Sequence, residues 1–194
     1  MHALRIAALT ALLALSAAAQ SPLDPALLAK ANAGDPSAQL AAGEALTRTA
    51  AALTDPDDRD AALAQAAIWY RKAADQNNLA SELRLAEAFR DGRGLPRDPA
   101  QAAIWYRKAA EQGDSSAQAT LGVLYSLGHG VPQDDAEAYF WFDVASLTPG
   151  PGQQKCAANR QAIGMRITAD QFADEQKRLK SWKTTHPQPN LPIH

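Results

Sequence analysis

The chain contains the same ten residues twice, and this repetition constrains its fold more than any other feature. The sequence QAAIWYRKAA occurs at Gln65–Ala74 and again at Gln101–Ala110. A related stretch, AYFWFDVAS, begins at Ala138 and places Trp141 36 residues after Trp105. A catalytic site is normally built once, so verbatim repetition at a fixed period indicates a scaffold of repeated structural units.

A second block recurs upstream of each tryptophan. It reads SAQLAAGEAL from Ser37, ASELRLAEAF from Ala80 and SAQATLGVLY from Ser116. Its apolar residues follow helical spacing, and a small residue such as Gly122 allows a neighbouring helix to approach closely. Each unit is therefore predicted to be two helices, helix A and then helix B, joined by a turn.

The residues between the two blocks predict how each helix pair turns. Asp91-Gly-Arg-Gly94 supplies glycines for the end of helix A, and Asp98-Pro-Ala-Gln101 resembles a capping box with proline at the first helical position. Residues 134–137 repeat this pattern. The first unit carries a seven-residue insertion, which we place in its loop near residues 54–58.

One helix pair cannot bury its own apolar face, whereas stacked pairs bury a continuous core. We therefore predict an all-α fold, a superhelix of three helix-turn-helix repeats with the tryptophans in its core. The predicted repeats are about 35–77, 78–113 and 114–149, followed by two capping helices at about 154–183. Residues 184–194 hold three prolines without helical periodicity and predict a loose tail.

The first residues predict a secretory signal peptide at 1–19. Arg5 is followed by an apolar run, Ile6–Leu15, and by small residues ending at Ala19. The alternative is a membrane anchor, but a span needs about 20 apolar residues. We expect a repeat domain at 20–183 without a membrane span, in a protein exported across the inner membrane and located in the periplasm.

Composition excludes some functions. The 194 residues carry 19 basic and 21 acidic side chains, a formal net charge of −2, too balanced for nucleic-acid binding through a basic patch. The single cysteine, Cys156, cannot form an internal disulfide, and we expect it to be buried. A reactive thiol beside Lys155 and Arg160 is the alternative.

The repeated motifs resemble those of the Sel1-like repeat family. The A-x-x-x-L-G-x-x-Y pattern stands at Ala117–Tyr125, the G-x-G-V-P-x-D turn at Gly128–Asp134, and the W-Y-x-K-A-A pattern at Trp105–Ala110. The resemblance implies a right-handed α-α superhelix, an α-solenoid related to tetratricopeptide repeats, and protein–protein adaptor roles, often in secreted bacterial proteins. Some secreted relatives are cysteine-rich and linked to β-lactam binding, but this chain lacks their paired cysteines.

The chain shows no motif of a known catalytic, nucleotide-binding or metal-binding site. His129 lies between two turn glycines and is interpreted as a surface residue. The acidic residues of 55–60 miss the spacing of a calcium loop. We expect a monomeric non-enzyme without cofactor or metal. An enzyme or binder acting on cell-wall material or β-lactams, and a bare structural spacer, are the alternatives.

The predicted function is protein binding, as a scaffold, adaptor or regulator with a protein partner. The exposed register of each helix A would form a small apolar seam flanked by charged and polar residues, which suits an extended or helical segment of another protein. The candidate binding residues are Leu40, Glu44, Thr47, Leu83, Glu87, Arg90, Ala119, Val123 and Ser126.

Overall fold

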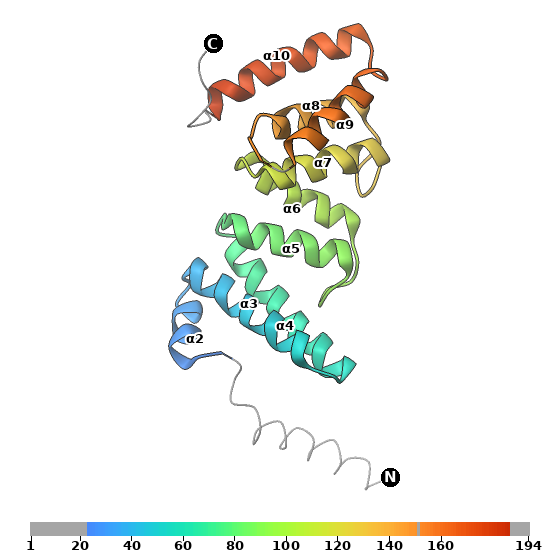
Figure 1. Cartoon of the computed structure of the whole chain (residues 1–194). Coiled ribbons are helices and arrows are strands. Elements are labelled where there is room, and N and C mark those ends of the chain that lie inside the picture. Colours follow the sequence, from blue (N-terminus) through green and yellow to red (C-terminus); the bar gives the residue numbers. More distant parts are fainter. Residues whose placement is uncertain (1–22, 151, 187–194) are drawn as a thin grey trace, which may run out of the picture. The chain divides into compact units, whose positions relative to one another are not determined.

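The computed structural model describes residues 23–150 and 152–186, and the regular elements in these ranges are helices (Figure 1). In chain order they are α2 (Pro25–Asn32), α3 (Pro36–Ala52), α4 (Pro56–Ala74), α5 (Leu79–Asp91), α6 (Pro99–Glu111), α7 (Ser115–Leu127), α8 (Asp135–Ser146), α9 (Gln153–Gly164) and α10 (Ala169–Thr185). The predicted all-α fold is confirmed. The predicted signal peptide and the residues after 186 lie outside the described part.

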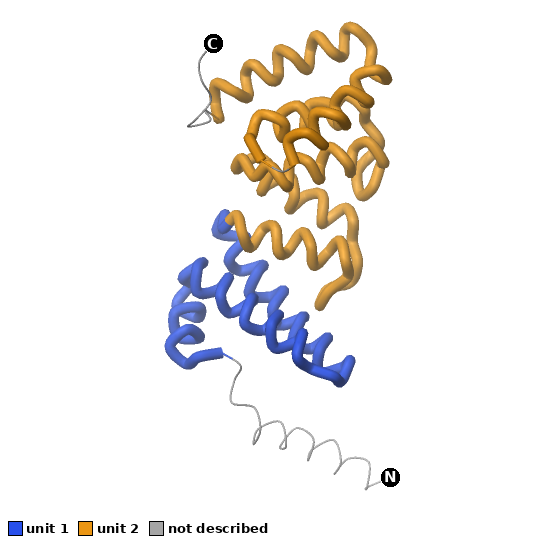
Figure 2. The backbone as a smooth tube through the Cα atoms, viewed as in Figure 1, with its two compact units in different colours: residues 1–78 blue, residues 79–194 orange. Residues whose placement is uncertain are grey.

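The chain divides into two compact units, residues 1–78 and residues 79–194 (Figure 2). In unit 1, α3 and α4 are the helices A and B of repeat one, and α2 packs against α3. In unit 2, α5 pairs with α6 and α7 pairs with α8, which are repeats two and three. The two last helices, α9 and α10, both pack against α8.

Helix α2 is absent from the predictions, although the sequence contains a signal for it. Residues 30–35 read KANAGD, and residues 109–114, at the end of α6, read AAEQGD. In both places a glycine with positive φ ends the helix, Gly34 at 97° and Gly113 at 95°. An aspartate follows each glycine and caps the next helix, Asp35 for α3 and Asp114 for α7. Helix α2 therefore ends as a helix B does.

The prediction that the insertion of repeat one lies in its loop is wrong. Helices α3 and α4 have 17 and 19 residues, whereas α5 and α6 have 13 each, so the insertion lengthens the helices. Alanine is the best helix former, and the run Ala50–Ala52 continues α3 to its end. Asp55 then caps α4, accepting hydrogen bonds from the amides of Asp57 and Asp58, with Pro56 at the first helical position.

The predicted aspartate caps of the helices B are confirmed. The side chain of Asp98 accepts from two amides at the start of α6, and that of Asp134 does the same for α8. Glu137 does not complete the predicted box by bonding back to Asp134, because its carboxylate is bonded to Trp141 and Arg178. A reciprocal box does form at the start of α10, between Thr168 and Gln171.

The repeated tryptophans lie in the core, as predicted. Trp69, Trp105 and Trp141 are all buried. The ammonium of Lys72 lies 4.3 Å from the ring centroid of Trp69, and that of Lys108 lies 3.9 Å from the ring of Trp105. A cation over an indole face is attracted by the ring quadrupole, so each repeated lysine covers the tryptophan of its own helix.

The small residues of helix A allow the predicted close approach of helix B. A Cβ added to Gly43 would lie 2.5 Å from the ring of Tyr70, and one added to Gly122 would lie 2.7 Å from the ring of Phe142. Both distances are below any real Cβ contact, so glycine is required at these positions. In repeats one and three the aromatic side chain of helix B therefore packs on the bare backbone of its helix A, whereas repeat two carries Ala86 at this position.

A buried polar side chain recurs near the start of each helix A, and the sequence patterns did not reveal it. The amide of Gln39 donates to the carbonyl of Ala31, and that of Gln118 donates to the carbonyl of Ala110, both at 3.1 Å. Repeat two has Glu82 in this place, fully buried. A carboxylate can only accept, and Glu82 accepts from the side chain of Gln112 at 2.7 Å.

Candidate functional site

Three of the predicted binding residues lie on α3 in unit 1. Leu40, Glu44 and Thr47 are all half-buried. The hydroxyl of Thr47 donates to the carbonyl of Gly43, and it lies 2.9 Å from the hydroxyl of Tyr70. Because the threonine proton is already used, the tyrosine donates in this second bond. Thr47 thus holds a core tyrosine of α4.

The other six predicted residues lie in unit 2. Those on α5 are Leu83, Glu87 and Arg90, and those on α7 are Ala119, Val123 and Ser126. Arg90 and Val123 are exposed, and the remaining four are half-buried. The structure therefore presents some surface of each residue to solvent, which the proposed role requires, and the role itself stays a prediction.

The charged residues of α5 are paired with one another. The guanidinium of Arg84 lies 3.4 Å from the carboxylate of Glu87, and that of Arg90 lies 2.7 Å from Asp91. The hydrogen bond between Arg90 and Asp91 raises the pKa of the arginine and lowers the pKa of the aspartate. A ligand with charges of its own would have to compete with these pairs.

Arg90 also supports the core. Its guanidinium donates to the hydroxyl of Tyr106 at 2.9 Å. Burial raises the pKa of Tyr106 to about 12, although the charge of Arg90 opposes the shift. Arg90 and Thr47 occupy corresponding positions, so the same position of helix A holds the tyrosine of helix B in repeats one and two. The predictions missed this structural role.

Helix α7 differs from α5 in presenting an apolar strip. Ala119, Val123 and Leu127 follow at intervals of four residues, which places them on one face. Val123 is 38% exposed and Leu127 is 57% exposed. The corresponding residues of α5 are acidic, Glu87 for Val123 and Asp91 for Leu127. We call these three residues the α7 strip. The predictions missed Leu127, which its spacing from Val123 could have revealed.

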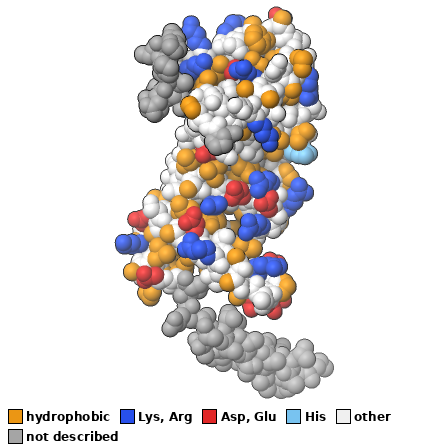
Figure 3. All heavy atoms as spheres, in the orientation of Figure 1, with side chains coloured by type: hydrophobic (Ala, Val, Ile, Leu, Met, Phe, Trp, Pro, Cys, Tyr) orange, Lys and Arg blue, Asp and Glu red, His pale blue; other side chains and the backbone are white. Residues whose placement is uncertain are grey.

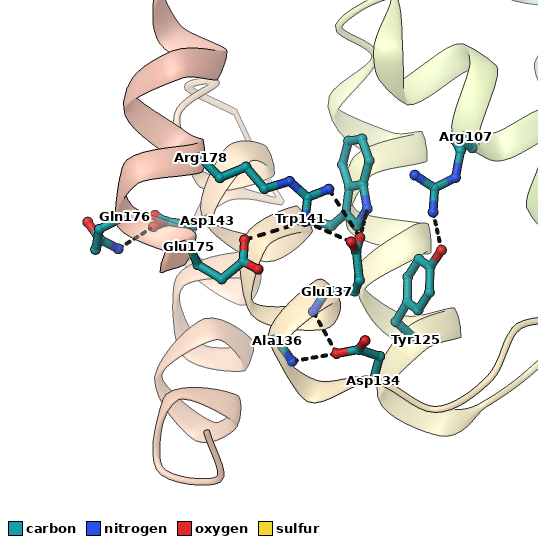
Figure 4. Close-up of polar contacts among 10 residues, drawn as sticks. All are labelled: Arg107, Tyr125, Asp134, Ala136, Glu137, Trp141, Asp143, Glu175, Gln176 and Arg178. Atoms are coloured by element: carbon teal, nitrogen blue, oxygen red, sulfur yellow. Dashed lines mark hydrogen bonds and ion pairs between the residues drawn. The ribbon is translucent and has the colours of Figure 1, made fainter. Parts of the chain in front are cut away.

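The far end of unit 2 is closed by α10, which is anchored on α8 (Figure 4). Arg178 of α10 forms an ion pair with Glu137 of α8 at 2.7 Å, and the indole of Trp141 donates to the same carboxylate at 3.1 Å. The guanidinium of Arg178 also lies 3.8 Å from the ring centroid of Phe140. These contacts cover the last apolar face of the repeats with a charged helix.

Figure 4 shows two further contacts near this anchor, one between Gln176 and Asp143 and one between Arg107 and Tyr125. Asp143 of α8 is buried and paired with Arg160 of α9 at 2.6 Å, and the amide of Gln176 approaches its second oxygen at 3.5 Å. On the other side of Trp141, the guanidinium of Arg107 donates to the hydroxyl of Tyr125. The polar groups seen here serve packing between helices.

The expected absence of metal and nucleophile chemistry stays a prediction. Within residues 23–150 and 152–186, no group of three His, Cys, Asp or Glu side chains could hold a metal ion. Cys156 is buried, as predicted, and burial raises the pKa of its thiol although Lys155 opposes the shift. His129 is exposed in its turn. None of the helices that the structure describes is both long and apolar enough to cross a membrane.

Comparison with protein families identifies three repeats. The model of the Sel1 repeat matches residues 50–78, 79–114 and 115–147, which together make up half of the chain. The second and third matches coincide with α5–α6 and α7–α8. A search of curated proteins found no match.

Two solved structures share this arrangement of helices. One is c5321, a protective antigen present in uropathogenic Escherichia coli strains, which displays an SLR fold. It is 30% identical, with a TM-score of 0.65, over 87% of this chain and 36% of its own, so this chain spans about a third of its length. The other is a Sel1 repeat protein from Oxalobacter formigenes, 29% identical with a TM-score of 0.57 over 70% of this chain and 95% of its own.

Proposed function

The chain belongs to the Sel1 repeat family, and from this premise we propose that it is a secreted, periplasmic scaffold or adaptor that binds a partner protein through its helices A. Proteins of this family usually act through protein–protein interaction and are typically non-catalytic. In unit 2 the binding surface is centred on the α7 strip.

The observation that carries this proposal is the exposure of the strip. Solvent-exposed faces of helices are normally polar, and α5 follows this rule with Glu87 and Asp91. Val123 and Leu127 break it at the corresponding positions of α7. Since exposed apolar groups are removed from water when a partner binds, the strip can contribute to affinity, and the ion pairs of α5 can contribute to specificity.

The surface around the strip suits a helical or extended segment of another protein. An amphipathic helix binds through residues spaced by three or four, the same spacing that the strip itself shows. Lys and Arg side chains lie interspersed with Asp and Glu side chains on the visible face of the molecule (Figure 3). A partner with mixed charges is therefore expected, in contrast to nucleic acid.

Capture from extract tests this proposal. The full-length mature chain, residues 20–194, would be immobilised as wild type and with Val123→Asp and Leu127→Asp together. The matched control carries Ile68→Asp and Ile104→Asp, which place the same two charges on exposed isoleucines of α4 and α6. We expect one protein to be retained by the wild type and the control and lost from the variant of the α7 strip. Equal retention by all three would refute the role of the strip.

The proposed location rests on the first 19 residues, whose charged start, apolar run and small residues are typical of a secretory signal. Fractionation of cells that express the chain, with mass spectrometry of its N-terminus, tests the location. We expect periplasmic protein that begins at Gln20. Uncleaved protein in the cytoplasm would contradict the proposal.

A further inference from the structure

Helix α9 lies in the place of a helix A but has no helix B. In unit 2, α5 lies alongside α6 and α7 lies alongside α8, with extensive contact between the members of each pair. Helix α9 packs against α8 as α7 packs against α6, yet its backbone contact with α10 is sparse, because α10 lies against α8 instead (Figure 1). One side of α9 is thus left without the helix that its predecessors have.

A cavity of about 550 Å³ is lined by residues of α8, α9 and α10. This volume falls within the range of about 300–1,000 Å³ that is common for ligand pockets. Tyr139 of α8 and Phe172 of α10 form one part of its wall, in an edge-to-face pair with ring centroids 5.7 Å apart. Ala157, Ala158 and Gly164 of α9 form another part. We call this feature the α9 cavity.

Apolar surface around the cavity is left exposed to solvent. Phe172 is 44% exposed, although its ring packs on Tyr139. Helix α9 buries only Cys156 and Ile163, whereas α7 buries residues along its whole length, from Ala117 to Tyr125. Ala157 and Ala158 are the small residues that leave room for a close neighbour, whereas Gly164 is already approached by the ring of Tyr139, which lies 3.2 Å from an added Cβ.

The packing within the repeats shows which kind of side chain fits a helix surface made of small residues. In repeats one and three, an aromatic side chain of helix B packs directly on a small residue of helix A. The charge of α9 also indicates which kind of helix could bind there, because α9 carries Lys155 and Arg160 and no acidic residue. Arg160 lines the cavity but is paired with the buried carboxylate of Asp143, so Lys155 is the α9 cation that is left to attract an acidic partner. The matching helix has an aromatic residue toward Ala157 and Ala158, with acidic residues beside it.

We propose that the α9 cavity receives an amphipathic, acidic helix of a partner protein, which takes the place of the missing helix B. Its aromatic side chain enters between Ala158 and Phe172. This inference rests on the proposed function, protein binding, but it concerns a surface other than the α7 strip. The array would then be extended by one repeat in the complex.

A designed peptide tests the proposal on the mature chain. The probe is a helix-stapled, fluorescently labelled copy of residues 98–112, a helix B of this protein, with Arg107→Glu and Lys108→Glu to make it acidic. One control peptide keeps Arg107 and Lys108. The other control peptide carries Tyr106→Ala together with the two acidic substitutions. Fluorescence anisotropy then compares the wild type with Ala158→Glu and Phe172→Ala. Ala162→Glu, at an exposed position of α9 that does not line the cavity, is the matched control protein.

We expect the acidic probe to bind the wild type and Ala162→Glu equally, and Ala158→Glu and Phe172→Ala about tenfold more weakly, a loss of about 1.4 kcal/mol. Both control peptides should bind more weakly than the acidic probe. Circular dichroism establishes that each variant is folded, and because Ala158 and Phe172 are exposed we expect this to hold.

Three outcomes would overturn the proposal. The first is no binding of the probe, and the second is equal binding by Ala158→Glu and the wild type. The third is self-association of the wild type that Ala158→Glu abolishes, since the occupant would then be a second copy. The protein with Val123→Asp and Leu127→Asp must still bind the probe. If this variant binds the probe but fails to capture the partner, the failure concerns the α7 strip and not the cavity.

Discussion

Repeats two and three show how the same helix position becomes either surface or core. Ile104 of α6 and Phe140 of α8 occupy corresponding positions, 36 residues apart. Ile104 is 49% exposed, whereas Phe140 is 2% exposed and packs against Trp182 and Arg178 of α10. The difference arises because α8 ends the array and is covered by α10. An array of repeats needs such a cover only at its end.

A second difference lies inside the two repeats. Gln118 of repeat three donates its amide proton to a backbone carbonyl, while Glu82 of repeat two can only accept when ionised. Burial raises the pKa of Glu82, although the charge of Lys108 and the hydrogen bond from Gln112 oppose the shift. Glu111 contributes in the same direction as burial. Ionised Glu82 therefore lowers the folding stability of repeat two, whereas the neutral side chain of Gln118 has no such effect in repeat three.

The largest expected effect tests the covered face. Phe140→Ala removes a buried ring and should lower the free energy of unfolding by about 3–5 kcal/mol. Ile104→Ala, at the corresponding exposed position, should change it by about 0.5 kcal/mol or less. Urea denaturation followed by circular dichroism measures both. Similar losses for the two variants would show that α10 does not cover α8 in solution.

The next effect concerns the anchor of α10. Arg178→Met breaks the ion pair with Glu137, and since the pair is partly exposed we expect a loss of about 1 kcal/mol. Lys177→Met, which breaks an exposed pair with Asp174, is the control and should have almost no effect. A double-mutant cycle with Glu137→Gln isolates the pair energy. A coupling energy of zero in that cycle would show that the ion pair does not help to hold α10 on α8.

Glu82→Gln should give repeat two the neutral glutamine that repeats one and three carry at this position. We expect about 1 kcal/mol of added stability at neutral pH, the typical net value of one hydrogen bond. The folded state binds the Glu82 proton more tightly than the unfolded chain does. Stability of the wild type should therefore fall, relative to the variant, as the pH rises from the ordinary carboxyl pKa to the raised pKa of Glu82.

Thermal unfolding of both proteins between pH 4 and 8 measures this dependence on pH. Above the raised pKa the difference should be constant. A wild type that gains stability over the variant with rising pH would reverse the sign and exclude a raised pKa for Glu82.

The smallest effect concerns the two helices A. Val123→Glu gives α7 the residue that α5 carries at Glu87, and since Val123 is exposed the stability should change by about 0.5 kcal/mol or less. Its thermal midpoint would be compared with that of the wild type. A loss as large as that of Phe140→Ala would mean that Val123 belongs to the core, and the α7 strip could not then be a free surface.

Much of the fold could be predicted because its information is local. The spacing of Trp69, Trp105 and Trp141 indicates the repeat, and the aspartate–proline pairs indicate the starts of helices. The position of the insertion could not be predicted in the same way. Proline at position 56 is compatible with a loop or with the first turn of a helix, and only the packing of α3 along α4 favours two long helices.

The candidate site was predicted in part. The exposed register of helix A located Val123 and Arg90 on the surface, but pattern alone could not show that Arg90 bonds Tyr106 or that Thr47 bonds Tyr70, because these contacts join different helices. The α9 cavity was not predicted. Its walls come from α8, α9 and α10, and no spacing in the sequence relates them.

Local signals in the sequence were enough to predict most of the helices, their period and the core aromatic residues, because helix propensity, capping and apolar spacing act within a few residues of each other. Only the packing of the helices shows that α10 covers α8 and leaves α9 without a helix B, and that Glu82 is buried where other repeats have glutamine. Burial and partner choice depend on which helices meet in space, and residues far apart in the chain settle that choice.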